Sequence, residues 1–208
     1  MPRLLDLFCG RWGWSRAFAA RGWDCMGIDL QEPSEIPKNC CWSNANVLRV
    51  TTGFIRDGNF DFIVASSPCE EFSVHGMKHF HPSPKHPEMG IKLFNHTRAL
   101  CEASGLPYVM ENVRPAQKFV GRASHHCGPF YLWGNAIPPL MPQNIYKGMA
   151  LGMSIDKVTE KRILAGGRRF SSKSKQRKEH TALLAEIPPE LANCVADYAE
   201  RLLEGKAA

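Results

Sequence analysis

The feature that most limits the fold is a repeated pattern of short apolar runs, each of strand length and each followed by glycine, a carboxylate or a cysteine. As far as residue 113, these runs alternate with segments of helical pattern. The alternation favours an α/β fold, with a mostly parallel sheet flanked by helices on both faces. In such sheets ligands bind beyond the carboxyl ends of the strands. Four residues follow an apolar run at that end: Gly10, Asp29, Cys69 and Glu111.

The first apolar run ends in a turn that contains Gly10 and Gly13, and residues 15–21 are then expected to form a helix that stops at Gly22. Glycines let a backbone approach a bound nucleotide closely, although the full G-x-G-x-x-G spacing is absent. Asp29 ends the next run, about twenty residues beyond the first glycine, where a carboxylate can accept hydrogen bonds from ribose hydroxyls. The pattern indicates a nucleotide-binding corner, and an ordinary βα turn is the alternative.

Cys69 follows the apolar run Phe62–Ala65 and lies on a loop that starts at Pro68. Structural cysteines are usually buried in an apolar element, where burial raises the pKa and makes the thiol inert. Cys69 is instead flanked by hydroxyls and carboxylates on a loop, which favours a nucleophile. A simply buried cysteine is the alternative.

Glu111 and Asn112 lie at the far end of a strand-like run, Tyr108–Val113. A carboxylate among such apolar neighbours is hard to solvate, so its pKa would be raised and it could hold or donate a proton near neutral pH. The alternative is an edge-strand glutamate that points into water.

Three segments, residues 6–13, 68–73 and 111–113, resemble in the same order the motifs of the C5-cytosine DNA methyltransferases. The resemblance extends over residues 1–113 and, more thinly, over 187–193, which looks like the segment that in the family returns beside the cofactor site. It implies a Rossmann-like, S-adenosylmethionine-dependent methyltransferase.

In that family a thiolate adds to cytosine C6, and C5 then takes the methyl group. Carried over by position, Cys69 is the nucleophile, protonated Glu111 contacts cytosine N3 and the exocyclic amine, and Asn112 fixes the loop. Arg122 would stand in for a missing arginine at the cytosine O2 edge or a phosphate. The residues assigned to substrate binding are Ser66, Ser67, Ser73, Arg168, Arg169 and Lys173.

The resemblance also implies an S-adenosylmethionine site, with the methionine part over the glycine turn, Asp29 on the ribose and Asn46 near the adenine. Trp12 stands where the family usually has a glycine, and it would line the cofactor pocket or cap the substrate side. The full set assigned to the cofactor is Asp6, Phe8, Cys9, Gly10, Trp12, Gly13, Asp29, Asn46 and Pro68.

Charge gives a mixed indication about the substrate. Glu70 and Glu71 follow the nucleophile, which disfavours close contact with phosphate unless a cation compensates. The run from Lys161 to Lys178 contains only basic charges and suits either a phosphate-contacting loop or a solvated, disordered one. It belongs to a basic, flexible segment of about residues 142–186 that takes the place of a recognition domain, as in short phage-type enzymes. We therefore expect broad or very short sequence specificity.

Composition sets the remaining expectations. A chain of 208 residues with net charge +6 suits a single domain over residues 1–208 that acts on DNA in the cytoplasm, that of a bacterial host if the protein is phage-encoded. The longest apolar runs fall well short of the roughly 20 residues that span a bilayer, and the eight cysteines lack disulfide or metal-binding spacing, so neither membrane nor metal is expected. The oligomeric state stays open, a dimer included. Two alternatives remain: the same chemistry on a free cytosine nucleotide such as dCMP, and a non-catalytic nucleic-acid-binding protein.

Overall fold

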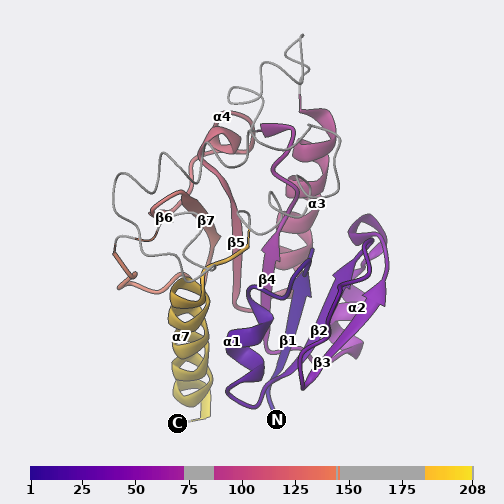
Figure 1. The fold of residues 1–208 in the computed structure, drawn as a ribbon, viewed down its shortest axis with the longest axis vertical. Coiled ribbons are helices and arrows are strands. Elements are labelled where there is room, and N and C mark those ends of the chain that lie inside the picture. The colour runs from indigo at the N-terminus through magenta and orange to yellow at the C-terminus, as the bar shows by residue number, and fades with distance from the viewer. Residues whose placement is uncertain (73–86, 144, 146–185, 208) are drawn as a thin grey trace.

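The computed structural model describes residues 1–72, 87–143, 145 and 186–207. Its described strands form one sheet in the order β3-β2-β1-β4-β5-β7-β6 (Figure 1). The strands are β1 (Arg3–Leu7), β2 (Asp24–Asp29), β3 (Cys40–Asn44), β4 (Phe62–Ser66), β5 (Tyr108–Val113), β6 (His125–Cys127) and β7 (Phe130–Gly134).

Strands β1 to β5 are parallel, so their carboxyl ends share one edge of the sheet. The chain runs outward from β1 to β2 and β3, then crosses back to place β4 on the other side of β1. The order therefore reverses between β1 and β4, which is where doubly wound sheets bind ligands. Strands β6 and β7 continue the sheet in antiparallel pairing. The expected mostly parallel sheet is confirmed.

Helices cover both faces of the sheet, as predicted (Figure 1). The helix expected over residues 15–21 is shorter than predicted and is followed by a turn. The described helices are α1 (Ser15–Ala19), α2 (Thr52–Asp57), α3 (Glu88–Ser104), α4 (Gln117–Val120) and α7 (Pro189–Ala207), with short 3₁₀ turns η1 (Val47–Arg49) and η3 (Arg114–Ala116).

Each face of the sheet has its own apolar core. Leu4 of β1 pairs with Phe62 of β4 beneath α1 and α7, whereas the next pair, Leu5 and Ile63, points toward α2 and α3. All four side chains are fully buried. A central strand buried on both faces reads as a continuous apolar run, which explains why the sequence pattern located these strands.

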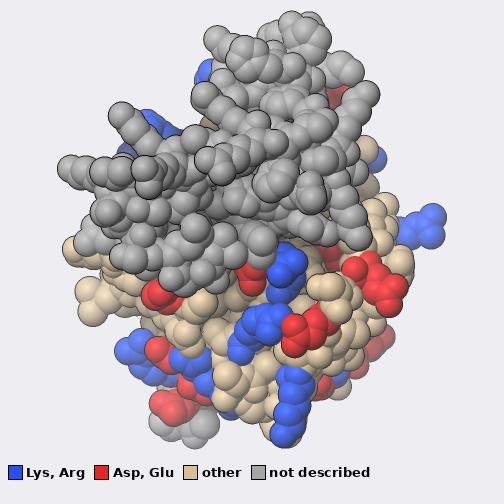
Figure 2. All heavy atoms as spheres, viewed as in Figure 1, with Lys and Arg blue, Asp and Glu red and all other residues tan. Residues whose placement is uncertain are grey.

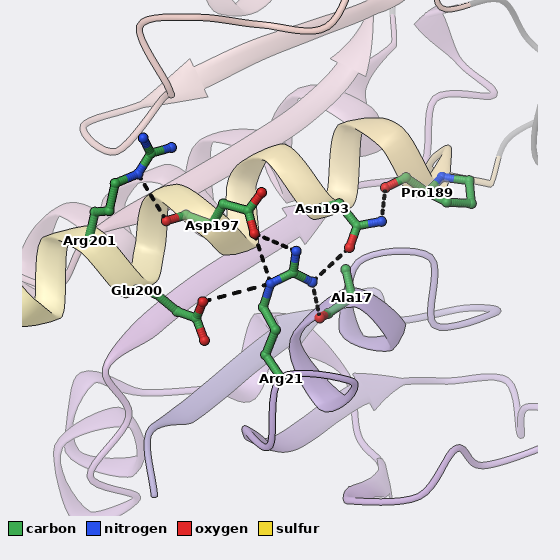
Figure 3. A network of polar contacts seen from close by, with 7 residues as sticks. All are labelled: Ala17, Arg21, Pro189, Asn193, Asp197, Glu200 and Arg201. Carbon is green, nitrogen blue, oxygen red and sulfur yellow. Dashed lines mark hydrogen bonds and ion pairs between the residues drawn. The ribbon is translucent and has the colours of Figure 1, made fainter.

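Helix α7 is fixed against α1 by Arg21, which lies just beyond the end of α1 (Figure 3). The Arg21 guanidinium donates hydrogen bonds to the Ala17 carbonyl and to Asn193 Oδ1, both at 2.7 Å. It also pairs with Asp197 and, at 3.8 Å, with Glu200. Partly exposed ion pairs of this kind contribute about 1 kcal/mol or less each.

The apolar side of α7 supplies the larger part of this docking. Leu191, Val195 and Ala199 recur at helical spacing, and all three are fully buried in the core they share with α1. Burial of one such leucine or valine side chain stabilises a fold by about 1.5–3 kcal/mol. The hydrophobic face therefore holds α7, and Arg21 sets its position along α1.

On the face in Figure 2, Lys and Arg side chains of the described residues are interspersed with Asp and Glu. Among the described helices, none combines the length and apolarity that a bilayer crossing requires.

Candidate active site

The carboxyl edge of the parallel strands carries the candidate site, and a side-chain hydrogen bond links each adjacent pair of strand ends from β2 to β5. These links occur between β2 and the turn after β1, between that turn and β4, and between β4 and β5. Each link involves a residue in or beside a motif that the sequence analysis singled out.

The glycine turn after β1 has an unusual backbone, because Phe8 and Trp12 have φ angles of 64° and 65° in the left-handed region. Such angles are costly for non-glycine residues and persist only where the surroundings enforce them. Here the Gly10 N–H donates to Asp29 Oδ2 at 3.0 Å, while Asp29 Oδ1 accepts from the Gln31 N–H at 2.9 Å. Asp29 therefore shapes the turn as well as lying at the end of β2.

Asp6 lies inside the sheet, near the end of β1, and is almost fully buried. Ser15 Oγ donates to Asp6 Oδ2 at 2.6 Å, whereas Asp6 Oδ1 has no hydrogen-bond partner among the described residues. Burial raises the pKa of Asp6 from 3.8 to about 7, although the Ser15 hydrogen bond acts in the opposite direction. The carboxyl group can therefore gain or lose a proton near neutral pH.

Trp12 is fully buried, and its indole fills the space beside Gly27 of β2. A Cβ on Gly27 would lie 2.5 Å from the Trp12 ring and 2.6 Å from Cys9 Sγ, so only glycine fits there. Burial raises the pKa of the Cys9 thiol far above its usual value, which makes Cys9 a packing residue rather than a nucleophile. Trp12 thus occupies volume that a glycine at this position would leave open.

The chain returns to the glycine turn at residues 186–188, just before α7. A Cβ on Gly13 would lie 2.9 Å from the backbone nitrogen of Ile187, so the two backbones are in direct contact. Arg11 Nε donates to Glu186 Oε2 at 3.2 Å beside this contact. The expected return of the segment 187–193 to this turn is confirmed.

The turn is linked to β4 through Trp14, whose indole Nε1 donates to Ser66 Oγ at 3.0 Å. Trp14 is almost fully buried at the start of α1. The Ser66 hydroxyl, expected to meet a phosphate or a water, thus already has a protein partner. No sequence pattern predicted that this tryptophan would form a hydrogen bond to β4.

Strand β4 is linked to β5 through the fully buried Asn112. Asn112 Nδ2 donates to the Ser67 carbonyl at 2.9 Å and to Ser67 Oγ at 3.0 Å, while Asn112 Oδ1 accepts from the Val113 N–H at 2.8 Å. Ser67 directly precedes Pro68 and Cys69. Asn112 therefore holds the start of the cysteine loop against the neighbouring strand.

Cys69 and Glu111 belong to adjacent strand ends. Ser66, the last residue of β4, is paired in register with Glu111 of β5, and Cys69 follows three residues later. Glu111 is 9% exposed, and Cys69 is a half-buried thiol outside any disulfide. Glu111 and Cys69 therefore lie at the same edge of the sheet. They belong to β5 and to the loop after β4, and β4 is one of the two strands between which the strand order reverses.

Glu71 bears on the concern about negative charge beside the nucleophile. Its Oε2 accepts from the Gly90 N–H at 2.8 Å, in the first turn of α3. The N-terminus of a helix carries partial positive charge, so it compensates this carboxylate. The next residue, Phe72, is fully buried and its ring lies close to Gly90. The loop is thus anchored to α3 directly after Glu70.

Two further predicted residues lie at the periphery of this edge. Asn46 follows β3, and its Oδ1 accepts from the Leu48 N–H at 3.0 Å to cap η1. Arg122 is exposed in the segment between α4 and β6. Phe119 of α4 lies 6.1 Å from the ring of Phe72, so α4 packs near the cysteine loop.

Several predicted substrate contacts lie outside the described residues: Ser73, Arg168, Arg169 and Lys173, with most of the basic segment 142–186. Within the described ranges, no cluster of His, Cys, Asp or Glu side chains could hold a metal ion.

Comparison of the sequence with protein-family models and with curated proteins finds no match. Among solved structures, the methyltransferase EhMeth of Entamoeba histolytica superposes with a TM-score of 0.53 at 8% identity, over 98% of this chain and 99% of that one. The chain has the Rossmann-like fold of a methyltransferase. At this identity the likeness concerns the fold alone.

Two other solved structures superpose less well. A DNMT2 mutant of Spodoptera frugiperda gives a TM-score of 0.40 at 12% identity, over 98% of this chain and 99% of that one. A protein described as a DNA modification methyltransferase encoded within an E. coli prophage gives 0.43 at 19% identity, over 56% of this chain and 33% of that one. This chain thus matches only a third of the prophage protein, and superpositions this weak add no argument about function.

Proposed function

We propose that this protein is an S-adenosylmethionine-dependent methyltransferase that methylates cytosine C5 in DNA through a covalent intermediate on Cys69. The observation that carries the proposal is the Ser67–Asn112 link, which holds the cysteine loop against the strand that bears Glu111. A nucleophile and an acid at neighbouring strand ends suit attack on one edge of a flat ring.

The residues around the glycine turn fit a cationic cofactor that carries a ribose. Asp6 Oδ1 is buried and has no partner among the described residues, and a positively charged group nearby would favour its ionised form. The Asp29 carboxylate at the end of β2 already binds the Gly10 N–H and has further lone pairs for ribose hydroxyls. Trp12, fully buried against Gly27, would support the turn by packing and would not line the cofactor pocket.

When bound, S-adenosylmethionine supplies an electrophilic methyl group. The Cys69 thiolate would attack C6 of cytosine, so that an S–C6 bond forms and an electron pair moves to C5, which becomes nucleophilic enough to take the methyl group. Loss of the C5 proton then lets the electron pair return to the ring as the S–C6 bond breaks. Cys69 leaves as a thiolate, and the product is 5-methylcytosine.

Glu111 would hold a proton at cytosine N3 and thereby neutralise charge that builds on the ring during the attack. Its burial in β5, beside the strand end that leads into the cysteine loop, supports contact with a base held there. Asn112 would position the loop through Ser67, without touching the base.

DNA is the proposed substrate, and the Glu71 contact with α3 supports it. The α3 N-terminus compensates the charge of Glu71. The cysteine loop should therefore repel a DNA phosphate less than two free glutamates would. Methyl transfer to duplex DNA, single-stranded DNA and dCMP, measured side by side, distinguishes a polynucleotide substrate from a free nucleotide.

The decisive experiment uses DNA that contains 5-fluorocytosine, with cofactor present. The fluorine cannot leave as a cation, so a methylated adduct should stay attached to Cys69 and survive denaturing electrophoresis. The Cys69→Ser variant should form no adduct, whereas Cys101→Ser, which changes a cysteine buried in the α3 core, should still form one. A Cys69→Ser variant with full methylation activity would overturn the mechanism.

A further inference from the structure

Two neighbouring cysteine thiols take no part in the proposed reaction. Cys25 of β2 and Cys40 of β3 are paired in register, and directly paired residues of neighbouring parallel strands point to the same face of the sheet. The hydrogen-bond interaction between the two side chains is the largest influence on the pKa of both thiols, and it acts in opposite directions on the two. Cys25 and Cys40 come together only through strand pairing, so the cysteine spacing in the sequence indicates no disulfide framework.

The two thiols have different surroundings. Cys25 is fully buried, and its sulfur lies 3.7 Å from the Ser15 carbonyl oxygen and 3.8 Å from that of Trp23. Cys40 is half-buried. One thiol of the pair is therefore open to small molecules, and the other is enclosed beside it.

Their acidities also differ. The hydrogen bond from Cys25 lowers the pKa of Cys40, and the Arg16 charge acts in the same direction, although burial and the carboxylates of Asp6 and Asp24 oppose it. The same hydrogen bond and burial raise the pKa of Cys25. Cys40 is thus the thiol that ionises first.

A hollow of about 470 Å³ lies beside Asn39, the residue before Cys40. It lies between α1 and the segment before β3, and its lining includes Arg16, Lys38 and Asn39. Cys40 directly follows Asn39, and its partner Cys25 contacts α1, so the pair and the hollow share one side of the sheet. The charge of Arg16, which also pairs with Glu35 at 3.5 Å, favours the Cys40 thiolate and its reaction with a small oxidant.

We propose that Cys40 and Cys25 form a peroxide-sensitive dithiol that closes reversibly to a disulfide between β2 and β3. The Cys40 thiolate attacks one oxygen of hydrogen peroxide, so an S–O bond forms as the O–O bond breaks, and hydroxide leaves and takes up a proton. The Cys25 sulfur then attacks the sulfenic sulfur of Cys40, an S–S bond forms, and water leaves with the Cys25 proton. The two thiols lose two electrons, and one peroxide becomes two waters.

The disulfide would have an effect beyond the two strands. Cys25 would lose its contact with the Ser15 carbonyl, and Ser15 is the residue whose hydroxyl donates to Asp6. Ser15 therefore connects the dithiol to the buried carboxyl of Asp6 near the end of β1.

The test treats the intact protein with hydrogen peroxide, blocks remaining thiols with iodoacetamide and identifies tryptic peptides by mass spectrometry. Cleavage after Lys38 separates Cys25 from Cys40, whereas Cys40 and Cys41 stay in one peptide. We expect a cross-linked peptide that dithiothreitol releases. The Cys41→Ser variant, changed at the exposed neighbour, should give the same cross-link, and this result assigns the bridge to Cys40.

The Cys25→Ala variant removes the resolving thiol and should leave a Cys40 sulfenic acid that dimedone traps. If the buried substitution prevents folding, the wild-type and Cys41→Ser cross-links decide the question by themselves. The proposal is overturned if the cross-link disappears in Cys41→Ser, or if Cys69 or Cys41 is oxidised while Cys25 and Cys40 stay fully alkylated. Neither readout depends on methylation activity.

Discussion

Replacement of Asn112 by alanine tests how the site is built. The substitution removes three hydrogen bonds in a fully buried place: two to Ser67 and one to the Val113 N–H. Each buried group that loses its partner costs about 1 kcal/mol or more, so we expect the free energy of unfolding to fall by about 3 kcal/mol. Urea denaturation followed by fluorescence measures this difference.

The effect on turnover should exceed the effect of lost stability. Asn112 holds the residue that precedes Pro68 and Cys69, and a nucleophile displaced by about 1 Å can lose about 100-fold in rate. Single-turnover methylation, measured below the unfolding range, should therefore slow by about that factor, while substrate binding changes little.

Asn135 provides the matched control, because it ties the opposite end of the same strand. Its Oδ1 accepts from the Tyr108 N–H at 2.8 Å, and its Nδ2 donates to the Leu106 carbonyl at 3.3 Å in an exposed position. Asn135→Ala should cost about 1 kcal/mol of stability and leave turnover unchanged. The reasoning fails if Asn112→Ala keeps wild-type single-turnover rates, or if the two variants lose equal stability and equal activity.

Three further predictions concern pH, the cysteine loop and the C-terminal helix. Because burial raises the pKa of Asp6 from 3.8 to about 7, the folded protein binds more protons than the unfolded chain in this window, and its stability falls by about 4 kcal/mol as pH rises through it. Asp6→Asn should lack this loss. Urea denaturation should therefore show that the stability of the variant, relative to the wild type, rises between pH 4 and pH 8. Equal changes of stability with pH in the two proteins would contradict the raised pKa of Asp6. Glu71→Ala should cost about 1 kcal/mol and speed hydrogen exchange at the start of α3, whereas Glu70→Ala should change neither; equal exchange in both variants would exclude the capping role. Arg21→Ala should lower the free energy of unfolding by about 1–2 kcal/mol. Arg201 is the control, because the described structure gives its side chain one exposed hydrogen bond, to the Asp197 carbonyl; an equal loss of stability in Arg201→Ala would argue against the Arg21 network.

Much of the parallel sheet could be predicted because its central strands are buried on both faces. Leu5 and Ile63 belong to continuous apolar runs, and such runs leave few alternatives to a parallel strand. The edge strand β3 was not predicted, since its burial is partial and its residues Cys40 and Cys41 do not read as an apolar run.

The polar links between strand ends could not be predicted from the sequence. Local patterns placed Asn112 and Glu71 near the nucleophile, but which atoms they contact depends on the strand register and on where α3 begins. Trp14 is the clearest case, because a tryptophan after a glycine turn reads as core, and only the fold brings its Nε1 to Ser66. The roles of Cys69, Glu111 and the cofactor residues stay predictions until the adduct experiment is done.

The contact between Gly13 and Ile187 has a consequence for how this protein matures. The Arg11 and Glu186 side chains that meet beside it are 175 residues apart in the chain, so this contact at the glycine turn cannot form until nearly all of this sequence has been synthesised and α7 has docked. Closing so long a loop is slow and entropically costly, which makes it a late event in folding. A nascent or clipped chain would thus hold its central sheet while the glycine turn still lacks its contact with residues 186 and 187, and ligand affinity would report whether assembly is complete.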